Sequence, residues 1–278
     1  MNVLIYEDYK HSHVTLYKSL CRHFGADAVG FCDMQDILRG CLDSTVDLFV
    51  MPGGADLYYV ERLRGEANNE IRTYVENGGT YLGICAGAYY GCAYIEWARN
   101  EGDHAICGSR DLAFFPGIAT GPVYEFIQDG NFKQSWQAAP RLLYNDGVNR
   151  KETCVYYHGG PVFSVQNIED DDTRIKVLAR YMDLPDQPGA IIECRVKKGK
   201  AILCSPHLEQ AASDLKKQIY RFHNKSYDWE KDVMDNLSSY ETSIRYIFSA
   251  ILDRCLQPFE DHPYQDGGVE SYEFHDEF

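Results

Sequence analysis

Residues 80–91 have the sequence TYLGICAGAYYG, which places a single cysteine, Cys85, between two glycines. The apolar run before the cysteine predicts a buried strand over residues 80–85, and a helix-like run follows it. A sharp strand-to-helix turn crowds the residue at its tip, so glycines two positions before and after it are needed. Gly83 and Gly87 occupy those positions. The pattern therefore predicts a nucleophile elbow, with a buried packing cysteine as the alternative.

The predicted turn also sets the chemistry expected of Cys85. The start of the helix places the sulfur at the positive end of a helix dipole, which favours the thiolate. The backbone N–H of Ala86 would then point to the position where an oxyanion forms. Gly53 and Gly54 end another predicted strand, at the sheet edge where open α/β sheets bind ligands. A second oxyanion donor is therefore expected from Gly54, and a plain strand-to-loop turn is the alternative.

The segments around the elbow alternate between strand and helix patterns, which implies a parallel sheet covered on both faces. Strands are predicted over residues 2–6, 26–31, 46–54 and 80–85, and helices over residues 13–24 and 68–79. From about residue 102 to residue 163 the alternation fails, and short strands with Gly/Pro turns predict an antiparallel excursion.

The C-terminal part of the chain is expected to add a hairpin and helices. The hairpin is predicted over residues 190–207 with its turn at 197–199, and helices over residues 208–223 and 238–256. From Phe259 onward there are seven acidic residues and neither lysine nor arginine, which favours a solvated tail. We expect one domain over residues 1–210, a helical extension over 211–257 packed on it, and an acidic tail over 258–278.

The hairpin ends in SPHLE, residues 205–209, which supplies a histidine and a carboxylate. If this segment stays extended, His207 and Glu209 project to the same side, so Glu209 can orient an imidazole that faces Cys85. A cysteine thiolate, a histidine base and an orienting carboxylate form a complete nucleophilic set. A lone histidine is more often structural, but the elbow and the glycine pair favour a catalytic role for His207. The other histidines, including His158, are given no catalytic role.

Composition limits the classes of function. The chain has 278 residues, 45% of them hydrophobic, which supports a sizeable core, and a formal net charge of −15. That charge repels phosphate, so neither nucleic acid nor an anionic membrane surface is expected as a partner. Ten cysteines without C-x-x-C or zinc-site spacing predict no metal and no cofactor. Neither a signal peptide nor a membrane span is expected, which predicts a reducing cytoplasm.

Several motifs resemble a known family. PGG, GICAG and PHLE, in this order on an α/β chain, resemble the class I glutamine amidotransferase-like superfamily. Longer stretches, residues 51–91, 108–122, 155–163 and 201–209, resemble the N-terminal domain of eukaryotic biotin-protein ligases.

The resemblance covers roughly residues 1–210 and implies a flavodoxin-like three-layer sandwich with a mostly parallel sheet. It also implies site residues. Cys85, His207 and Glu209 would form the triad, with Gly54 and Ala86 as oxyanion donors. The expected pocket comprises Gly53, Gly83, Gly87, Tyr89, Tyr90, Tyr157 and His158, with Tyr58, Tyr59 and the segment from Tyr156 to Gly160 at its rim.

The sequence departs from the family pattern in two ways. Amidotransferases usually have a glutamine four residues after the nucleophile, where this chain has Tyr89, so use of free glutamine is not implied. No Gly/Arg-rich loop for biotinyl-adenylate follows residue 210, so we expect no biotin ligase activity from this chain.

Three hypotheses follow. The first is a cysteine amidohydrolase or amidotransferase-like enzyme that acts on a small-molecule or peptide amide. Because no G-x-x-x-x-G-K-[ST] loop is present, ammonia-using chemistry would need a synthetase or ligase partner. The second is a non-catalytic binding or regulatory domain that retains the elbow, which Tyr89 favours. The third and weaker hypothesis is a cysteine peptidase-like hydrolase. The oligomeric state is left open.

Overall fold

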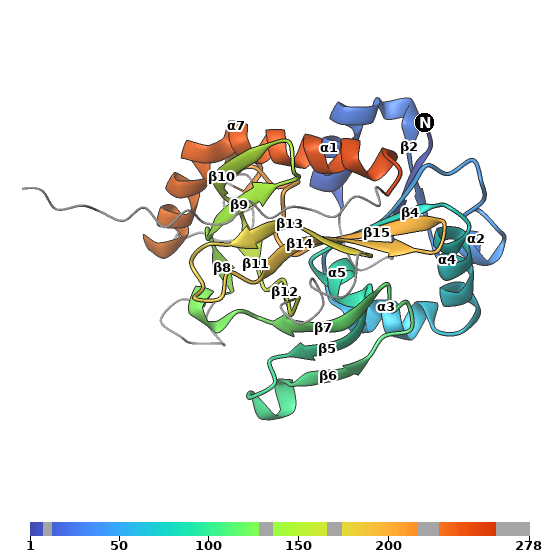
Figure 1. Ribbon diagram of the computed structural model, residues 1–278, viewed down its shortest axis with the longest axis horizontal. Helices are drawn as coiled ribbons and strands as arrows, with labels where there is room; N and C mark the ends of the chain where they lie inside the picture. The colour runs from blue at the N-terminus through green and yellow to red at the C-terminus, as the bar shows by residue number, and fades with distance from the viewer. Residues whose placement is uncertain (8–12, 128–135, 166–173, 216–227, 260–278) are drawn as a thin grey trace, which may run out of the picture.

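The computed structural model describes residues 1–7, 13–127, 136–165, 174–215 and 228–259 (Figure 1). Five strands of its 13-stranded main sheet form a parallel block, in the order β2-β1-β3-β4-β15, and every neighbouring pair in it is parallel. Its strands are β1 (Val3–Tyr6), β2 (Val29–Cys32), β3 (Leu48–Met51), β4 (Thr80–Ile84) and β15 (Gly199–Cys204). This order is that of flavodoxin-like sheets, so the predicted fold class is confirmed.

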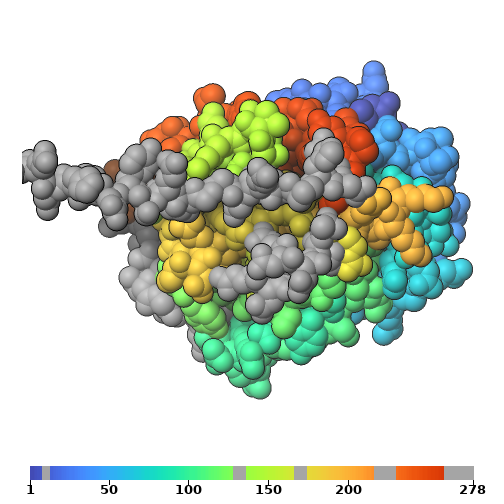
Figure 2. Space-filling model, viewed as in Figure 1, coloured from blue at the N-terminus to red at the C-terminus, as the bar shows by residue number. Residues whose placement is uncertain are grey.

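Helices cover both faces of this block, because side chains along each strand alternate between two apolar cores. Leu48 and Val50 of β3 belong to one core, and Phe49 and Met51 belong to the other. The first core is closed by α1 (Val14–Phe24) and α7 (Asp228–Leu256). The second is closed by α2 (Met34–Leu38), α3 (Asp56–Leu63), α4 (Glu66–Glu76) and α5 (Ala86–Tyr90). In Figure 2, α7 lies beside the N-terminal segments along one edge of the molecule.

The rest of the sheet is mostly antiparallel. β14 (Gly189–Val196) forms the predicted hairpin with β15, and the sheet continues from β14 through β12, β7, β5 and β6. These strands are β12 (Val162–Phe163), β7 (Phe115–Gly121), β5 (Cys92–Trp97) and β6 (Ile106–Ser109). The excursion therefore begins at β5, before residue 102, because β5 follows α5 directly. β5 and β7 are parallel, so the region is not wholly antiparallel.

A branch of this sheet leads to the edge that α7 covers. β13 (Ile175–Tyr181) pairs with β14 and with β9 (Arg141–Asn145), which pairs with β10 (Arg150–Cys154). β8 (Gln137–Ala138) and β11 (Tyr157–His158) form a separate pair. Short 3-10 helices are η1 (Ala26–Ala28), η2 (Gly102–His104) and η3 (Tyr124–Phe126).

Some element bounds differ from those predicted. The second strand begins at Val29, because residues 26–28 form η1. The helix predicted over 208–223 begins at Ala212, and its part beyond residue 215 lies outside the described residues. α7 begins at Asp228, well before residue 238. Of the predicted acidic tail, residues 260–278 lie outside the described residues.

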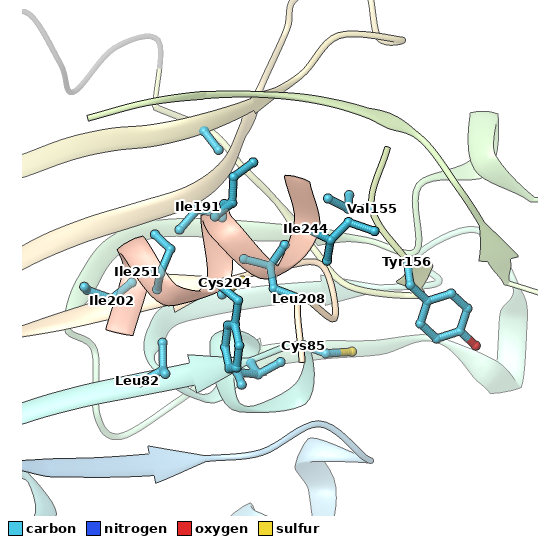
Figure 3. Close-up of a cluster of buried hydrophobic side chains, with 14 of the residues drawn as sticks. Leu82, Cys85, Val155, Tyr156, Ile191, Ile202, Cys204, Leu208, Ile244 and Ile251 are labelled. Atoms are coloured by element: carbon cyan, nitrogen blue, oxygen red, sulfur yellow. The ribbon is translucent and has the colours of Figure 1, made fainter. Parts of the chain in front are cut away.

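Apolar packing and a buried charge cluster hold α7 on the sheet. Ile244 and Ile251 of α7 are fully buried in the same core as Leu82 of β4 and Ile202 of β15 (Figure 3). Each such side chain contributes about 1.5–3 kcal/mol through burial. Apolar burial is therefore the main stabilising term between the helix and the sheet.

The charge cluster comprises Glu193 of β14, Lys200 of β15 and Arg254 of α7. Lys200 Nζ donates to Glu193 Oε1 at 2.9 Å, and Arg254 Nη2 donates to Glu193 Oε2 at 2.8 Å. Lys200 also donates to the backbone carbonyl of Arg254. Both carboxylate oxygens of Glu193 are thus engaged by cations, as a fully buried carboxylate requires. The cluster joins the last turns of α7 to the middle of the sheet.

Candidate active site

Cys85 lies on the turn between β4 and α5 with φ 50° and ψ −103°, a conformation that a residue with a side chain rarely adopts. Its two glycine neighbours are in close backbone contact. A Cβ on Gly83 would lie 2.4 Å from the Gly87 carbonyl oxygen, and one on Gly87 would lie 2.1 Å from the Met51 carbonyl oxygen. Neither contact tolerates a side chain, so the strained elbow forms only with glycine at both positions.

His207 and Glu209 lie on a turn that follows β15. His207 Nδ1 and Glu209 Oε1 are 2.7 Å apart, and both residues are buried, with 7% and 6% of their surface exposed. The Gln210 N–H donates to the His207 carbonyl at 3.2 Å, which closes the turn. The segment is therefore not extended, although the predicted contact between His207 and Glu209 assumed an extended backbone. The turn nevertheless brings the carboxylate onto the imidazole.

Gly53 lies between His207 and Cys85. A Cβ on Gly53 would lie 2.6 Å from His207 Cε1 and 3.5 Å from Cys85 Cβ, so its bare backbone contacts both side chains. The Cys85 sulfur and the His207 imidazole also interact electrostatically. Three segments far apart in the chain thus meet at the carboxyl edge of the parallel strands. This is the edge where open α/β sheets place their ligands.

The surroundings of His207 favour its positively charged form. Burial alone lowers the pKa of His207, but the Glu209 carboxylate and the Cys85 sulfur act in the opposite direction and prevail. The net result is a pKa of His207 well above its ordinary value. At neutral pH the imidazole therefore carries a proton that it can donate to a leaving group.

Two backbone N–H groups are candidates for an oxyanion hole. Gly54 and Ala86 both line the cavity beside Cys85. Among the described residues, neither N–H donates to a backbone carbonyl. The Cys85 sulfur lies 3.7 Å from the His158 carbonyl oxygen, which accepts a hydrogen bond from the thiol. Because α5 has only five residues, the N–H groups rather than a helix dipole would supply most of the stabilisation of a negative charge.

The triad candidates face a cavity of about 460 Å³, within the size range of small-molecule sites. Cys85, His207 and Glu209 line it together with side chains from α1, α3, β5 and β6. Of the pocket residues expected from the sequence, Gly53, Tyr89 and His158 line the cavity, and so does Gly159 of the expected rim.

Other expected pocket residues lie behind the cavity wall. Gly83 and Gly87 are in the backbone contacts of the elbow. The Tyr90 hydroxyl donates to Asn68 Oδ1 at 2.7 Å, and the Tyr157 hydroxyl donates to the Gly160 carbonyl at 2.8 Å. Tyr58, Tyr59 and Tyr156 of the expected rim are also absent from the described lining. Most of these tyrosines therefore pack inside the protein and do not line the cavity.

Sequence reasoning missed Trp97 and Trp136. Trp97 ends β5 and Trp136 directly precedes β8, in the region where the strand-helix alternation fails. Both line the cavity, and their rings meet edge to face with centroids 5.1 Å apart. No motif marks either residue, so only the folded arrangement shows that they share the site.

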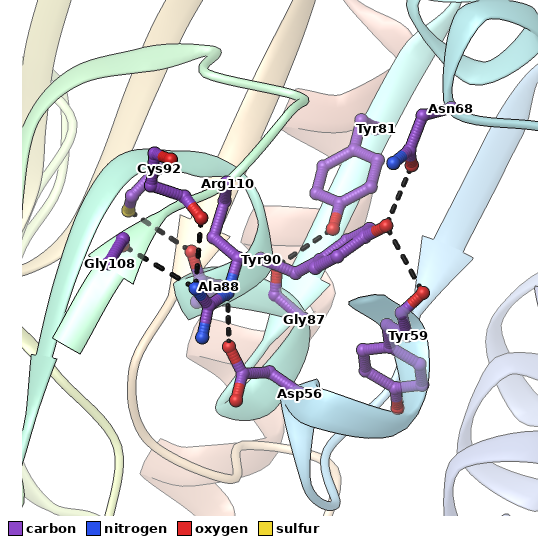
Figure 4. A network of polar contacts seen from close by, with 11 residues as sticks. Asp56, Tyr59, Asn68, Tyr81, Gly87, Ala88, Tyr90, Cys92, Gly108 and Arg110 are labelled. Atoms are coloured by element: carbon purple, nitrogen blue, oxygen red, sulfur yellow. Dashed lines mark hydrogen bonds and ion pairs between the residues drawn. The ribbon is translucent and has the colours of Figure 1, made fainter. Parts of the chain in front are cut away.

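Asp56 was also missed, although it follows Gly54 closely in the MPGGAD stretch. It lines the cavity and forms a buried ion pair with Arg110, whose Nε donates to Asp56 Oδ2 at 2.7 Å (Figure 4). Burial raises the pKa of Asp56, and the Arg110 guanidinium opposes that rise only in part. Arg110 Nη1 also donates to the Ser109 carbonyl at 2.9 Å. The pair thus ties the start of α3 to the end of β6.

The fold and the site define an α/β protein with a cysteine on a strand-to-helix elbow, facing a histidine–glutamate pair at the carboxyl edge of a parallel sheet. Comparison with known families gives the particular one. The chain belongs to the family described as biotin-protein ligase, N terminal, whose model matches residues 1–263. The predicted resemblance to this family is confirmed. The matched region runs past residue 210 and includes the whole of α7.

Two curated proteins show the same relationship. An uncharacterized protein of Chlamydia muridarum is 41% identical over 167 residues, which cover 60% of this chain and 62% of that protein. The biotin–protein ligase of Schizosaccharomyces pombe is 32% identical over 221 residues, which cover 76% of this chain and 34% of that enzyme. The chain thus spans less than two thirds of either relative.

Solved structures are similar at lower identity. A cytoplasmic protein of Salmonella typhimurium is 15% identical, with a TM-score of 0.46 over 92% of this chain and 100% of that one. A cold-adapted β-galactosidase of Rahnella sp. R3 is 12% identical, with a TM-score of 0.45 over 96% of this chain and 33% of that one. A Thermoplasma acidophilum protein described as a candidate component of GMP synthase is 15% identical, with a TM-score of 0.44 over 91% of this chain and 98% of that one. These likenesses are too distant to inform on activity.

Among the residues that the structure describes, no helix has the length and apolar character needed to cross a membrane.

Proposed function

We propose that this protein is a cysteine amidohydrolase or amidotransferase-like enzyme that cleaves a carboxamide through Cys85, His207 and Glu209. The observation that supports this most strongly is the 2.7 Å contact between His207 Nδ1 and Glu209 Oε1. The same imidazole interacts electrostatically with the Cys85 sulfur, and both line a cavity that is large enough for a substrate. This arrangement supports the proposal that a nucleophile, a base and an orienting carboxylate act together.

In the first step the Cys85 thiolate attacks the amide carbon, and the carbonyl oxygen becomes an oxyanion. The N–H groups of Gly54 and Ala86 hold that oxygen, and loss of one such donor costs on the order of a hundredfold or more in rate. The C–N bond then breaks as the His207 imidazolium gives its proton to the leaving nitrogen, which leaves a thioester on Cys85. Glu209 stabilises the charged imidazole throughout this step.

In the second step His207, now neutral, takes a proton from water, and the resulting hydroxide attacks the thioester carbon. The C–S bond breaks, the acid leaves, and Cys85 is regenerated as a thiolate beside the protonated imidazole. Protons and electrons balance without a metal or redox cofactor. If the released ammonia or amine is used for synthesis, a ligase or synthetase partner is the proposed recipient. A cytoplasmic location is proposed with it, and cell fractionation would test that.

One observation favours a second candidate, a binding or regulatory domain that retains the elbow. Tyr89 lies where amidotransferases usually have a glutamine that helps to hold their substrate. Its side chain is buried, and its hydroxyl donates to the Gly159 carbonyl at 3.1 Å, so it forms part of the wall. In such a domain Cys85 would be no more reactive than an ordinary cysteine.

Alkylation kinetics separate the two candidates. Iodoacetamide at one equivalent should label Cys85 before the other cysteines, as read by peptide mass spectrometry. Because Cys107 is exposed, a Cys107→Ser background removes the competing thiol. His207→Ala should slow labelling about tenfold or more at neutral pH, because the imidazolium stabilises the thiolate. The exposed His104 supplies the matched control, His104→Ala, which should leave the rate unchanged. Uniform labelling, or an unaffected rate in His207→Ala, would favour the binding domain.

The substrate class is tested by product release. Ammonia released from glutamine or from simple amides would support amide hydrolysis, and the Cys85→Ala variant should release none. Amine release from peptides alone would instead indicate the peptidase-like hydrolase.

A further inference from the structure

Part of the cavity wall is an aromatic corner, formed by Tyr89, Trp97 and Trp136. The rings of Trp97 and Trp136 meet at 86°, and the ring of Tyr89 meets that of Trp97 at 83° with centroids 5.9 Å apart. Perpendicular rings of this kind present a concave apolar surface, and they stabilise each other by about 0.5–1.5 kcal/mol per pair beyond the area that they bury. The three side chains therefore hold a fixed shape.

Gly159 keeps this corner open. Its φ is +78°, and a Cβ there would lie 2.9 Å from Trp97 Cη2 and 3.5 Å from Trp136 Cε3. The backbone at Gly159 thus lies against both indoles, and the hydroxyl of Tyr89 donates to its carbonyl. One backbone position fixes all three rings of the corner, so the corner is a built feature of the site.

The rest of the lining is apolar or already paired. Aliphatic side chains complete the apolar surface: Leu16, Leu57, Ile95 and Ile106. The two carboxylates of the described lining each have a cationic partner: Asp56 pairs with Arg110, and Glu209 pairs with His207. No lysine or arginine belongs to the part of the lining that the structure describes. The His207 imidazolium of the lining is already paired with Glu209. A carboxylate on the substrate would therefore lack an opposite charge of its own there, and its burial would be unfavourable.

We propose that the aromatic corner is an acyl-binding subsite, and that Cys85 acts on neutral carboxamides with an apolar chain or ring as their acyl group. Free glutamine, with its carboxylate and ammonium groups, does not fit this lining. The inference rests on the proposed amide-cleaving function and adds its substrate class. The amide carbon lies at Cys85, and the apolar part of the acyl group lies against Trp97 and Trp136.

Binding is measured on the Cys85→Ala variant, which cannot form a thioester. Two of the chain's three tryptophans line the cavity, so intrinsic fluorescence reports its occupancy. Affinity should rise about fourfold per methylene from propanamide to hexanamide, because each methylene is buried against the corner. Pentanamide and glutamine have the same carbon count, and pentanamide should bind about tenfold or more tightly.

Variants of the aromatic corner test whether the rise of affinity with chain length depends on it. Trp136→Ala should flatten the rise of affinity with chain length, and Trp136→Phe should preserve it because an aromatic wall remains. Tyr94→Ala is the matched control, since Tyr94 lies on the same strand as Trp97 but is 39% exposed and outside the cavity lining. An unchanged slope in a folded Trp136→Ala protein, or tighter binding of glutamine than of pentanamide, would overturn the proposal.

Turnover by the wild-type chain separates this proposal from the one on which it rests. If Cys85→Ala shows the chain-length series but the wild type cleaves no amide in it, the subsite stands and the amide-cleaving function fails. If the wild type releases ammonia from glutamine and not from pentanamide, the function stands and the apolar acyl subsite is overturned.

Discussion

Two clusters of buried ionisable side chains lie at different places on the same sheet. They differ in how many of their buried carboxylate oxygens have hydrogen-bond partners. Beneath α7, Glu193 is fully buried and both of its oxygens accept hydrogen bonds from Lys200 or Arg254. At the cavity, Glu209 Oε1 is paired with His207, but among the described residues Glu209 Oε2 is buried with no hydrogen-bond partner.

The difference separates a structural role from a functional one. A cluster that only stabilises the fold gains most when every buried polar atom is paired, because an unpaired one costs about 1–3 kcal/mol. At the cavity, one carboxylate oxygen has no protein partner among the described residues, and Cys85 has a strained backbone conformation. Such costs are concentrated at sites where the geometry serves chemistry. Substitutions in the two clusters should therefore have opposite signatures.

The largest expected effect on stability is that of Glu193→Ala. It leaves Lys200 and Arg254 as buried cations without their carboxylate, which should lower the free energy of unfolding by about 3–5 kcal/mol. Urea denaturation measures this loss. The folded fraction should still show the wild-type alkylation rate at Cys85.

A triple variant sharpens this result. Replacing Glu193, Lys200 and Arg254 together by methionine should cost less than Glu193→Ala alone, since no buried charge remains. A loss below about 1 kcal/mol in Glu193→Ala, or slowed alkylation of its folded form, would remove the distinction between the clusters.

The second effect concerns Asp56 and Arg110, which combine features of both clusters. The pair is buried and bridges two elements, yet Asp56 lines the cavity, and Arg110 Nη2 has no hydrogen-bond partner among the described residues. Asp56→Asn should lower the free energy of unfolding by about 2–4 kcal/mol, because the guanidinium is left uncompensated.

Double-mutant analysis identifies the cause of that loss. Asp56→Asn combined with Arg110→Gln should recover part of the stability, since the unpaired charge is gone. Additive losses in the unfolding measurements would show that the two side chains contribute independently. In that case Asp56 and Arg110 would not stabilise the fold as a pair, unlike the cluster of Glu193, Lys200 and Arg254.

The elbow could be predicted from the sequence because its requirement is local. Gly83 and Gly87 lie two residues from Cys85, and the crowding that they relieve is built into a strand-to-helix turn. The contact of His207 with Glu209 was also predicted, although a turn and not an extended segment makes it. Two residues so close in sequence can meet in more than one backbone conformation, which is why the conclusion survived a wrong premise.

The parts that could not be predicted depend on long-range contacts. Arg110 reaches Asp56 from 54 residues away, and Trp97 meets Trp136 across segments with no helical or strand periodicity to place them. Of the two tyrosines that follow the elbow, Tyr89 lines the cavity as expected but Tyr90 does not, for the same reason. Tyr90 points away from the cavity into the second core, a direction set by packing against Tyr59 and Asn68.

The smallest expected effect is a change in the pH dependence of stability in Glu209→Gln. The folded-state pKa of His207 is raised above its ordinary value of 6.5 by Glu209 and Cys85, against the effect of burial. A group with a raised folded pKa stabilises the fold fully below its unfolded pKa, and that stabilisation is lost as pH rises through the folded pKa. Without the carboxylate the pKa of His207 should fall, so less of this stabilisation should be lost as the pH rises.

Urea denaturation from about pH 6 to about pH 9 measures the change. The stability advantage of the wild type over Glu209→Gln should shrink by about 1 kcal/mol or more across this range, the equivalent of about one pKa unit. Glu241→Gln is the matched control, because Glu241 pairs with Arg245 on the surface of α7 and contacts no histidine in the described structure. Its curve should run parallel to that of the wild type. If the advantage of the wild type over Glu209→Gln stays constant with pH, Glu209 does not control the charge of His207. The cavity cluster would then lack the control of a titratable group that distinguishes it from the cluster beneath α7.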